Sequence, residues 1–511
     1  MSDPLSSHGD LFDRSGGPLL ARIKAWVGEQ LWVKKLYSPL GLALLLLCTL
    51  PVSYLLAHLD IGVGVPLFLA LILMPLAVFC IFDTVFAVGM MLLVAALVPF
   101  ALKLTAAPIG TLLDLLILLG TMGILLRQIR HRDWSFLKGP LPTMTLIWLY
   151  YNILQVLNPW ADSKMAWLYT VRSVALQQVV FFIAIYAFRH NRRALMILLK
   201  SLLLLGFVYA AYGLKQEYLG LSSWEETWLY SDPKRFELMF QWGRLRIASL
   251  CGDPTTFGIL MAGFSMLCLA LLLGPTREVQ KIVLGVLMVL ALWSMAYSGT
   301  RTAFMLVPIG GIFYCGLILN KRVLLIGGFL FLAGTAFVLK STTNPVIYRI
   351  KSAFNVENDD SMNVRLINQR KIQPYIQRHP FGGGLGSCGV WGERFSPGSE
   401  LSQFPHDSSF VRMGVELGWI GLILYTLLHY FVLRTGLHYF VRCRDPLIKA
   451  IYAGLTTWCF MLTVACYVQE AIIQLPTNII YNIMVAMLVT LKNFDPAYQQ
   501  QTPAAPEGSG A

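Results

Sequence analysis

Apolar runs long enough to cross a bilayer recur along most of the chain, and they constrain its fold more than any other feature. Such a run must be helical, because hydrocarbon offers no hydrogen-bond partner to the backbone. The 511 residues are 56% hydrophobic and only 13% charged, whereas soluble domains are closer to a quarter charged. The sequence therefore predicts an all-α, polytopic helical bundle in a membrane rather than a series of soluble domains.

About fourteen membrane-spanning helices are predicted, together with two long loops at 215–253 and 341–407. The predicted spans are 37–58, 62–82, 84–102, 108–126, 141–157, 167–188, 194–214, 254–273, 282–298, 302–319, 323–340, 408–433, 449–467 and 475–491. The corresponding regions are an N-terminal tail (1–36), N-terminal spans (37–164), central spans (165–340), the large loop (341–407), C-terminal spans (408–491) and a disordered C-terminal tail (492–511). We expect short helices within the large loop.

Lys and Arg residues are frequent in every second short loop and rare in the loops between, as the positive-inside rule requires. With the basic N-terminal tail in the cytoplasm, the inner loops hold Arg127, Arg130, Arg132, Lys138, Arg189, Arg192, Arg193, Arg277, Lys281, Lys321, Arg322, Arg434, Arg442, Arg444 and Lys449. The short outer loops hold little beyond Lys103, Lys164 and Arg301. Both termini are therefore expected inside, and both long loops outside. The long loops are basic as well, which indicates either a solvated surface of mixed charge or a site for an anion.

Two stretches place arginines at the predicted outer ends of spans. In GRLRIASLCGDPTTFG (243–258), Asp253 and Pro254 are typical of a helix start, but they leave Arg244 and Arg246 unexplained.

In YSGTRTAF (297–304), Arg301 stands in a tight turn between two spans. It either snorkels to the headgroups or directs a planar fork at phosphate oxygens inside a cavity.

A third stretch, FPHDSSFVRMGVELGWIG (404–421), opens a span with His406 and Asp407. A histidine here is either an interface or capping residue or, beside a basic cavity, a proton acceptor with a reference pKa near neutrality. Arg412 and Glu416 lie one helical turn apart and are expected to pair structurally.

The large loop ends in NVRLINQRKIQPYIQRHPFGGGLGS (363–387). Its apolar stripe predicts an amphipathic helix over 362–378 lying on the membrane. The glycines that follow either form an amide nest for an anion or simply turn the chain. Among nine scattered cysteines there is no C-x-x-C and no metal-ligand spacing, although Cys251 and Cys388 could meet outside as a disulfide.

FPHDSSFVRMGVELGWIG resembles the pattern of the bacterial O-antigen ligase/polymerase family, in which a Pro-His pair precedes a small polar run and Glu-Leu-Gly. RIASLCGDPTTFG and SGTRTAF resemble the family's other two motifs, in the same order. The resemblance covers roughly residues 165–435. Two features depart from the family pattern: Asp407 stands where Asn is common, and the predicted spans outnumber those usual for the ligases.

The resemblance implies a metal-independent glycosyltransferase of the bacterial inner membrane that acts outside it on glycans carried by undecaprenyl diphosphate, without a cofactor. Without a metal, arginines must stabilise the leaving diphosphate. The expected catalytic residues are His406, as base, and Arg301. The expected diphosphate-binding residues are Arg246, Arg301, Arg172, Arg244 and Arg365, and the expected supporting residues are Asp407, Arg412 and Glu416.

The acceptor is either another lipid-linked repeat, which makes the protein a polymerase, or lipid A-core or a protein, which makes it a ligase. The polymerase is favoured on span count and on the basic outer loops. The expected partners are the lipid-linked donor, the acceptor, membrane lipids, and a chain-length regulator and flippase of the same pathway, but no nucleic acid. The competing class is a lipid-glycan flippase, which should carry its charges at the midplane.

Overall fold

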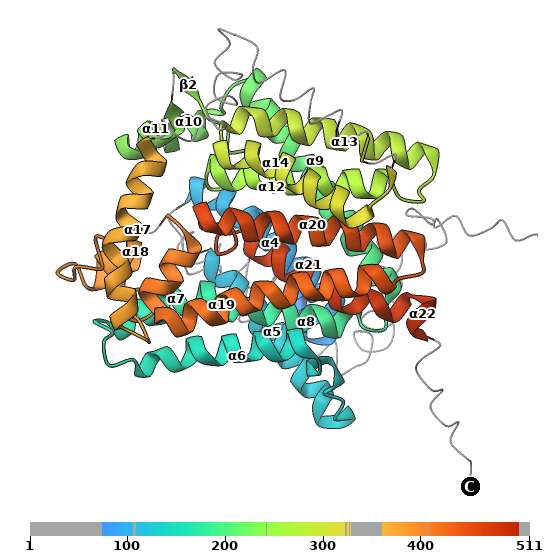
Figure 1. The fold of residues 1–511 in the computed structure, drawn as a ribbon, viewed down its shortest axis with the longest axis horizontal. Helices are drawn as coiled ribbons and strands as arrows, with labels where there is room; N and C mark the ends of the chain where they lie inside the picture. The colour runs from blue at the N-terminus through green and yellow to red at the C-terminus, as the bar shows by residue number, and fades with distance from the viewer. Residues whose placement is uncertain are drawn as a thin grey trace, which may run out of the picture.

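Long helices running roughly along one axis make up most of the computed structural model (Figure 1). The structure describes residues 74–105, 109–241, 243–321, 324–325, 328, 360–405 and 407–499. Within these ranges, nine helical segments are long and apolar enough to cross a membrane. The fold is therefore almost entirely helical and of the multi-pass membrane type. The predicted spans 37–58 and 323–340, and most of 62–82, lie largely or wholly outside the described residues.

The nine segments agree closely with the spans predicted over the same residues. They are α4 (Thr84–Leu104), α5 (Gly110–His131), Lys164–Phe188, α9 (Arg192–Tyr218), α12 (Pro254–Leu272), α13 (Glu278–Ser298), α14 (Arg301–Ile318), α19 (Ser409–Arg442) and α20 (Pro446–Val468). The segment Lys164–Phe188 comprises α7 (Lys164–Val174), η4 (Leu176–Gln178) and α8 (Val179–Phe188). The shorter helices α6 (Pro140–Leu154) and α21 (Thr477–Thr490) fall on two further predicted spans. The remaining short elements of the bundle are η2 (Ser135–Leu137), η3 (Gln155–Leu157), η5 (Leu491–Phe494) and α22 (Pro496–Gln499).

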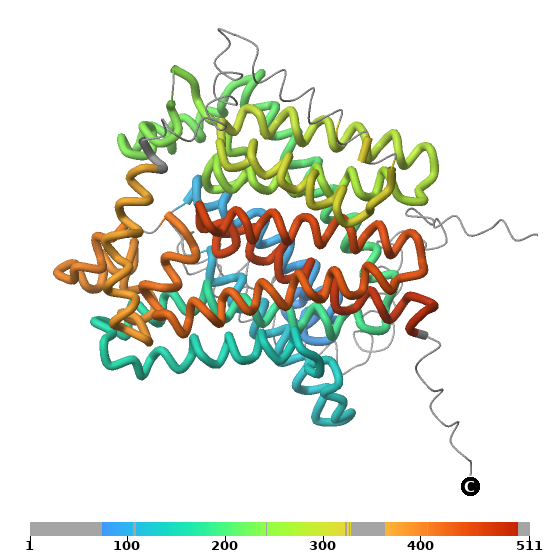
Figure 2. The backbone as a smooth tube through the Cα atoms, in the orientation of Figure 1, coloured from blue at the N-terminus to red at the C-terminus, as the bar shows by residue number. Residues whose placement is uncertain are grey.

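One end of the bundle carries a cap built from the two long loops. The first loop forms α10 (Ser223–Tyr230), α11 (Pro233–Met239), β1 (Phe240–Gln241) and β2 (Arg244–Leu245), and the second forms α17 (Asp360–Arg378) and α18 (Gly389–Phe395). The two strands pair antiparallel, with Phe240 opposite Leu245. Figures 1 and 2 show both segments at the left-hand end, with α17 running across the bundle axis. We call this the capped end.

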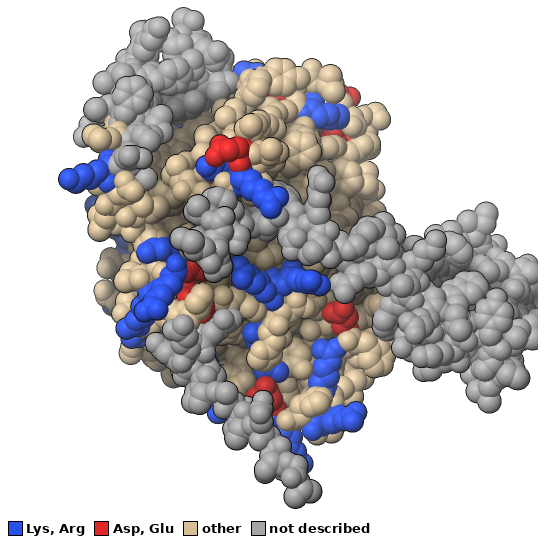
Figure 3. Space-filling model, turned by 90° about the vertical axis from the view of Figure 1, so that its right-hand side faces the viewer, with Lys and Arg blue, Asp and Glu red and all other residues tan. Residues whose placement is uncertain are grey.

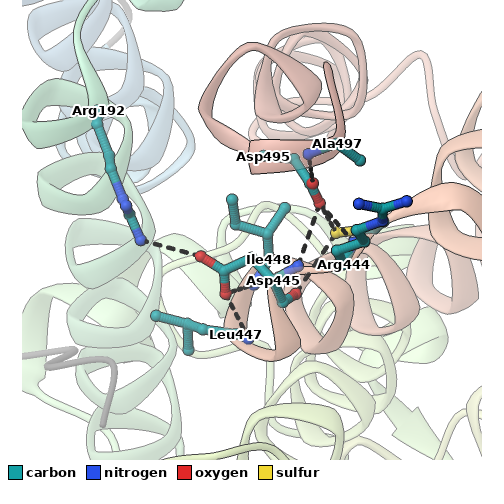
Figure 4. Close-up of polar contacts among 8 residues, drawn as sticks. Arg192, Arg444, Asp445, Leu447, Ile448, Asp495 and Ala497 are labelled. Atoms are coloured by element: carbon teal, nitrogen blue, oxygen red, sulfur yellow. Dashed lines mark hydrogen bonds and ion pairs between the residues drawn. The ribbon is translucent and has the colours of Figure 1, made fainter. Parts of the chain in front are cut away.

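The turns predicted to be cytoplasmic gather at the opposite end, which we call the basic end. Asp445 caps α20 by accepting from the backbone N–H groups of Leu447 and Ile448, and it pairs with Arg192 at the start of α9 across 3.4 Å (Figure 4). Asp495 accepts from the backbone N–H of Arg444 at 2.8 Å. Figure 3 looks onto this end, where Lys and Arg side chains are more prominent than Asp and Glu. Which side of the membrane this end faces stays a prediction.

Helix α19 bends at Gly418, whose φ of 69° lies in the left-handed region. The glycine-rich loop after α17 packs directly against this bend, and the N–H of Gly383 donates to the carbonyl of Val415 at 2.9 Å. A side chain at Gly382 would collide with the backbone of Gly418. Of the two interpretations of these glycines, close packing is therefore the one that the contacts favour.

The amphipathic helix predicted over 362–378 is present as α17. Ile372, Tyr375 and Ile376 pack on a small apolar cluster that includes Val415 of α19, whereas Val364 is 54% exposed. The C-terminal half of the stripe thus faces protein. Contact of the N-terminal half with a membrane stays a prediction.

Candidate active site at the capped end

Arg246 is held at the junction of the cap and the bundle by neutral oxygen atoms. Its guanidinium donates to the Ser298 carbonyl at 3.0 Å and to the Thr300 hydroxyl at 3.1 Å. Longer contacts of 3.4 Å reach the Leu238 carbonyl and the Thr255 hydroxyl. Within the described residues, no carboxylate lies at ion-pair distance from this side chain. The charge is therefore fixed in place by hydrogen bonds to neutral acceptors and not by a direct ion pair.

A second positive charge lies beside Arg246, because Arg301 is the first residue of α14. Burial lowers the pKa of Arg246, the charge of Asp253 opposes this shift, and the charge of Arg301 lowers the pKa further. Asp253 also caps α12 by accepting from the N–H groups of Thr255 and Thr256 at 2.8 and 2.9 Å, which confirms the predicted helix start. The N-termini of α12 and α14 add partial positive charge. An anion would be stabilised at this corner.

The segment 469–476, between α20 and α21, connects this corner to the start of α19. The side-chain amide of Gln469 donates to the hydroxyl of Thr302, next to Arg301, at 3.2 Å. The carbonyl of the same residue accepts from the Ser409 hydroxyl at 3.1 Å. The structure thus brings together the second and third sequence motifs, which are about a hundred residues apart in the chain.

The first motif joins the same assembly through Gln474, whose side-chain oxygen accepts from the Thr256 hydroxyl at 2.7 Å. Sequence reasoning missed Gln469, Glu470 and Gln474. Their only signal was a cluster of polar residues, QEAIIQ, between two apolar runs.

Arg412 forms the centre of a buried ionic cluster in the first turns of α19. Its Nε lies 3.0 Å from Glu416, which confirms the predicted pair, and one terminal nitrogen lies 2.9 and 3.0 Å from the two oxygens of Glu470. The side chain of Arg412 is 8% exposed and that of Glu416 is fully buried. The cluster therefore fixes α19 against the segment 469–476.

The Cys388 thiol donates to Glu416 at 3.2 Å from the glycine-rich loop. Burial and the charge of Glu416 raise the pKa of this thiol well above its usual value, so it remains a protonated donor. Cys251 and Cys388 are both buried and free. The two thiols therefore do not form the disulfide that the sequence left open, because they lie in different apolar clusters.

Asp407 pairs with Arg365 of α17, the carboxylate lying 3.1 Å from Nε. This contact joins α17 to the residues just before α19, and it pairs the charge of Arg365 with a carboxylate. His406 lies outside the described residues. Its role as a base therefore stays a prediction, as does the role of Asp407 beside it.

Two other arginines predicted to bind diphosphate are also matched by carboxylates. Arg172 of α7 pairs with Asp114 of α5, with Nε 2.7 Å from the carboxylate. Arg244 of β2 pairs with Glu217 at the end of α9, and its guanidinium lies 5.3 Å from the ring centroid of Tyr297. Arg172 and Arg244 thus each pair with a carboxylate, whereas Arg246 is bonded to neutral oxygen atoms.

The fold and this corner define a multi-pass membrane protein with a basic site at one end of its helical bundle. Residues 257–426 match the model of the family described as O-antigen ligase, which confirms the resemblance seen in the sequence motifs. The second and third motifs lie within the match, and the first overlaps its start. A comparison with curated proteins gave no match. The family match supports a glycosyltransferase activity on a lipid-linked glycan and an acceptor.

Proposed function

We propose that the protein transfers a glycan from undecaprenyl diphosphate to an acceptor hydroxyl at the capped end, and that the product is an extended polysaccharide. The observation that carries the proposal is the charge state of Arg246. This half-buried guanidinium is held by neutral acceptors next to Arg301. Two like charges in a partly desolvated corner are costly unless an anion offsets them. Asp253 offsets part of the positive charge at Arg246, and a lipid-anchored diphosphate would supply further negative charge.

The reaction forms a bond between the acceptor oxygen and the anomeric carbon of the donor and breaks the bond from that carbon to the diphosphate. Negative charge accumulates on the leaving diphosphate in the transition state. Arg246 and Arg301 would stabilise this charge, as preorganised donors do in other enzymes. Guanidinium groups suit the task because they bind phosphate oxygens in pairs. No metal is required in this scheme.

The acceptor hydroxyl loses its proton to His406 in this proposal. The histidine directly precedes Asp407, which forms an ion pair with Arg365 of α17. The start of α19 is held in turn by the buried cluster at Arg412. Such restraint matters because an error of about 1 Å in the position of a catalytic group can cost a hundredfold in rate.

The role of His406 is tested by measuring donor affinity and turnover on one purified variant. His406→Ala should lower turnover by a factor on the order of 10²–10⁴, while donor affinity stays close to wild type because the arginines provide it. A parallel loss of both quantities would instead make the imidazole a ligand of the diphosphate. No loss of either would leave it an interface residue.

The polymerase is distinguished from a ligase by its acceptor. Purified protein supplied with a lipid-linked repeat alone should give a ladder of products that grow by one repeat. A ligase would give no ladder until lipid A-core or a protein acceptor is added. A flippase would move the lipid-linked repeat across a vesicle membrane without changing its length. The basic corner at the end of the bundle favours an enzyme, because a transporter is expected to hold its site at the midplane.

We further propose that the protein resides in the bacterial inner membrane, with the capped end in the periplasm and both termini in the cytoplasm. A chain-length regulator and a flippase would act beside it. Reporter fusions after residues 230 and 390 should read outside, and fusions after 135, 190 and 440 should read inside. An inside reading at 390 would place His406 in the wrong compartment and contradict the proposed reaction.

A further inference from the structure

An exposed stack of three aromatic rings stands in the cap, formed by Tyr230, Phe236 and Phe240. Neighbouring ring centroids are 5.3 and 5.2 Å apart, with interplanar angles of 26° and 9°. Nearly parallel rings at these separations are offset, so each leaves part of its face uncovered. Tyr230 is 67% exposed and Phe240 is 41% exposed, whereas Phe236 also packs on the small apolar cluster around Leu229. We call this group the aromatic stack.

The aromatic stack ends beside the arginine proposed to hold the diphosphate. Phe240 pairs with Leu245 across the two short strands, and Leu245 directly precedes Arg246. The backbone N–H of Arg246 donates to the carbonyl of Met239 at 2.8 Å. The guanidinium of Arg246 also contacts the Leu238 carbonyl at 3.4 Å, so a group linked covalently to a diphosphate there would start near the segment 238–240, which carries Phe240.

Charged side chains interleaved with the rings argue against burial of this surface in lipid. Glu226, Lys234 and Glu237 are exposed on the same two short helices, and charges of this kind are costly in hydrocarbon. Aromatic faces left open in water mark a binding surface. Carboxylates accept hydrogen bonds from hydroxyl groups, and the negative face of an aromatic ring attracts the weakly positive C–H groups of a pyranose. A carbohydrate offers both hydroxyl groups for the carboxylates and C–H groups for the aromatic faces.

We propose that the aromatic stack is a subsite for pyranose rings of the glycan whose diphosphate lies at Arg246. The inference rests on the proposed function, because it takes the direction of the glycan from the position of the diphosphate. The sugars nearest the reacting carbon would lie along Phe240 and Tyr230, and these side chains would help to select the glycan.

The test uses full-length protein in nanodiscs and two probes: the glycan released by mild acid from the lipid-linked pool of the producing cell, and inorganic pyrophosphate. Tyr230→Leu and Phe240→Leu keep apolar bulk but remove the ring face. Each should weaken binding of the released glycan about threefold to tenfold and leave pyrophosphate binding unchanged. Tyr230→Phe keeps the ring and should bind the glycan nearly as wild type does.

Trp293→Leu is the matched control, because Trp293 is 48% exposed but lies on α13 outside the aromatic stack. An equal loss of glycan binding in this variant would overturn the proposal. So would unchanged glycan binding in the double variant Tyr230→Leu/Phe240→Leu. Poor insertion of that double variant into nanodiscs, with intact glycan binding, would make the rings a membrane anchor and also overturn it. Wild-type protein that binds the glycan but not pyrophosphate would contradict the proposed function instead.

Discussion

Arg246 at the capped end meets different partners from two arginines, Arg189 and Arg192, at the basic end. At the basic end, Arg189 lies 2.8 Å from Asp133, and Arg192 lies 3.4 Å from Asp445. At the capped end, Arg246 donates to carbonyl and hydroxyl oxygens instead. An arginine matched by a carboxylate holds two turns together and presents little net charge. Arg246 is held by neutral acceptors beside a second positive charge, so its own charge is available to the proposed ligand.

The same contrast exists within the cap at a separation of two residues. Arg244 is paired with Glu217, and its side chain is 43% exposed. Arg246 shares the local sequence but not the carboxylate. The two positions therefore form a matched pair for mutagenesis, because they differ in charge partner while lying in the same segment.

The largest effect is expected from the buried cluster at Arg412. Arg412→Ala would leave Glu416 buried and without its ion-pair partner, which typically costs about 3–5 kcal/mol of stability. Thermal unfolding of the detergent-solubilised protein should therefore begin at a much lower temperature. The comparison is with Arg192→Ala at the basic end, where the side chain is 51% exposed and an ion pair contributes no more than about 1 kcal/mol. Similar losses in the two variants would contradict the distinction between a buried ion-pair cluster and an exposed ion pair.

Arg301 should matter for turnover more than for stability. Arg301→Ala should reduce turnover by a factor on the order of 10²–10³, the usual effect of removing one preorganised donor. Arg301→Lys should recover little, because an ammonium keeps the charge but loses the bidentate geometry. Product formation from lipid-linked repeats measures both variants. Full activity with lysine would indicate snorkelling at the headgroup level and weaken the contrast between the ends.

A smaller effect is expected at Gln469, which positions the corner without touching substrate. Gln469→Ala removes the hydrogen bond to Thr302 but keeps the backbone bond from Ser409. The loss of one such bond, about 1 kcal/mol, should lower kcat roughly fivefold and leave KM unchanged. A rise in KM at constant kcat would instead make Gln469 a substrate ligand. Partial rescue by Gln469→Asn would support positioning.

Local interactions account for what the sequence predicted well. The helix start at Asp253 and Pro254 depends on residues within one turn, and the pair between Arg412 and Glu416 depends on helical spacing alone. The spans followed from their own apolar length. In each case the physical cause lies within a few consecutive residues, so it could be read without the fold.

Interactions between distant segments could not be read in this way. Glu470 is 58 residues from Arg412, and nothing in its own surroundings indicates that partner. The bend at Gly418 arises because another loop packs there. The ion pairs that distinguish Arg172, Arg244 and Arg365 from Arg246 likewise depend on Asp114, Glu217 and Asp407, which lie elsewhere in the chain. The sequence therefore identified the arginines but did not indicate which of them pair with a carboxylate.

The most direct measurement is the affinity of the lipid-linked donor for Arg246→Ala and Arg244→Ala, determined side by side with wild type in nanodiscs without acceptor. Charge-assisted hydrogen bonds contribute about 1.5–3 kcal/mol, so Arg246→Ala should weaken donor binding roughly tenfold to a hundredfold. Arg244→Ala should stay within about threefold of wild type, because an exposed ion pair contributes little. Equal weakening in the two variants, or wild-type affinity in Arg246→Ala, would contradict the assignment of the diphosphate to this corner.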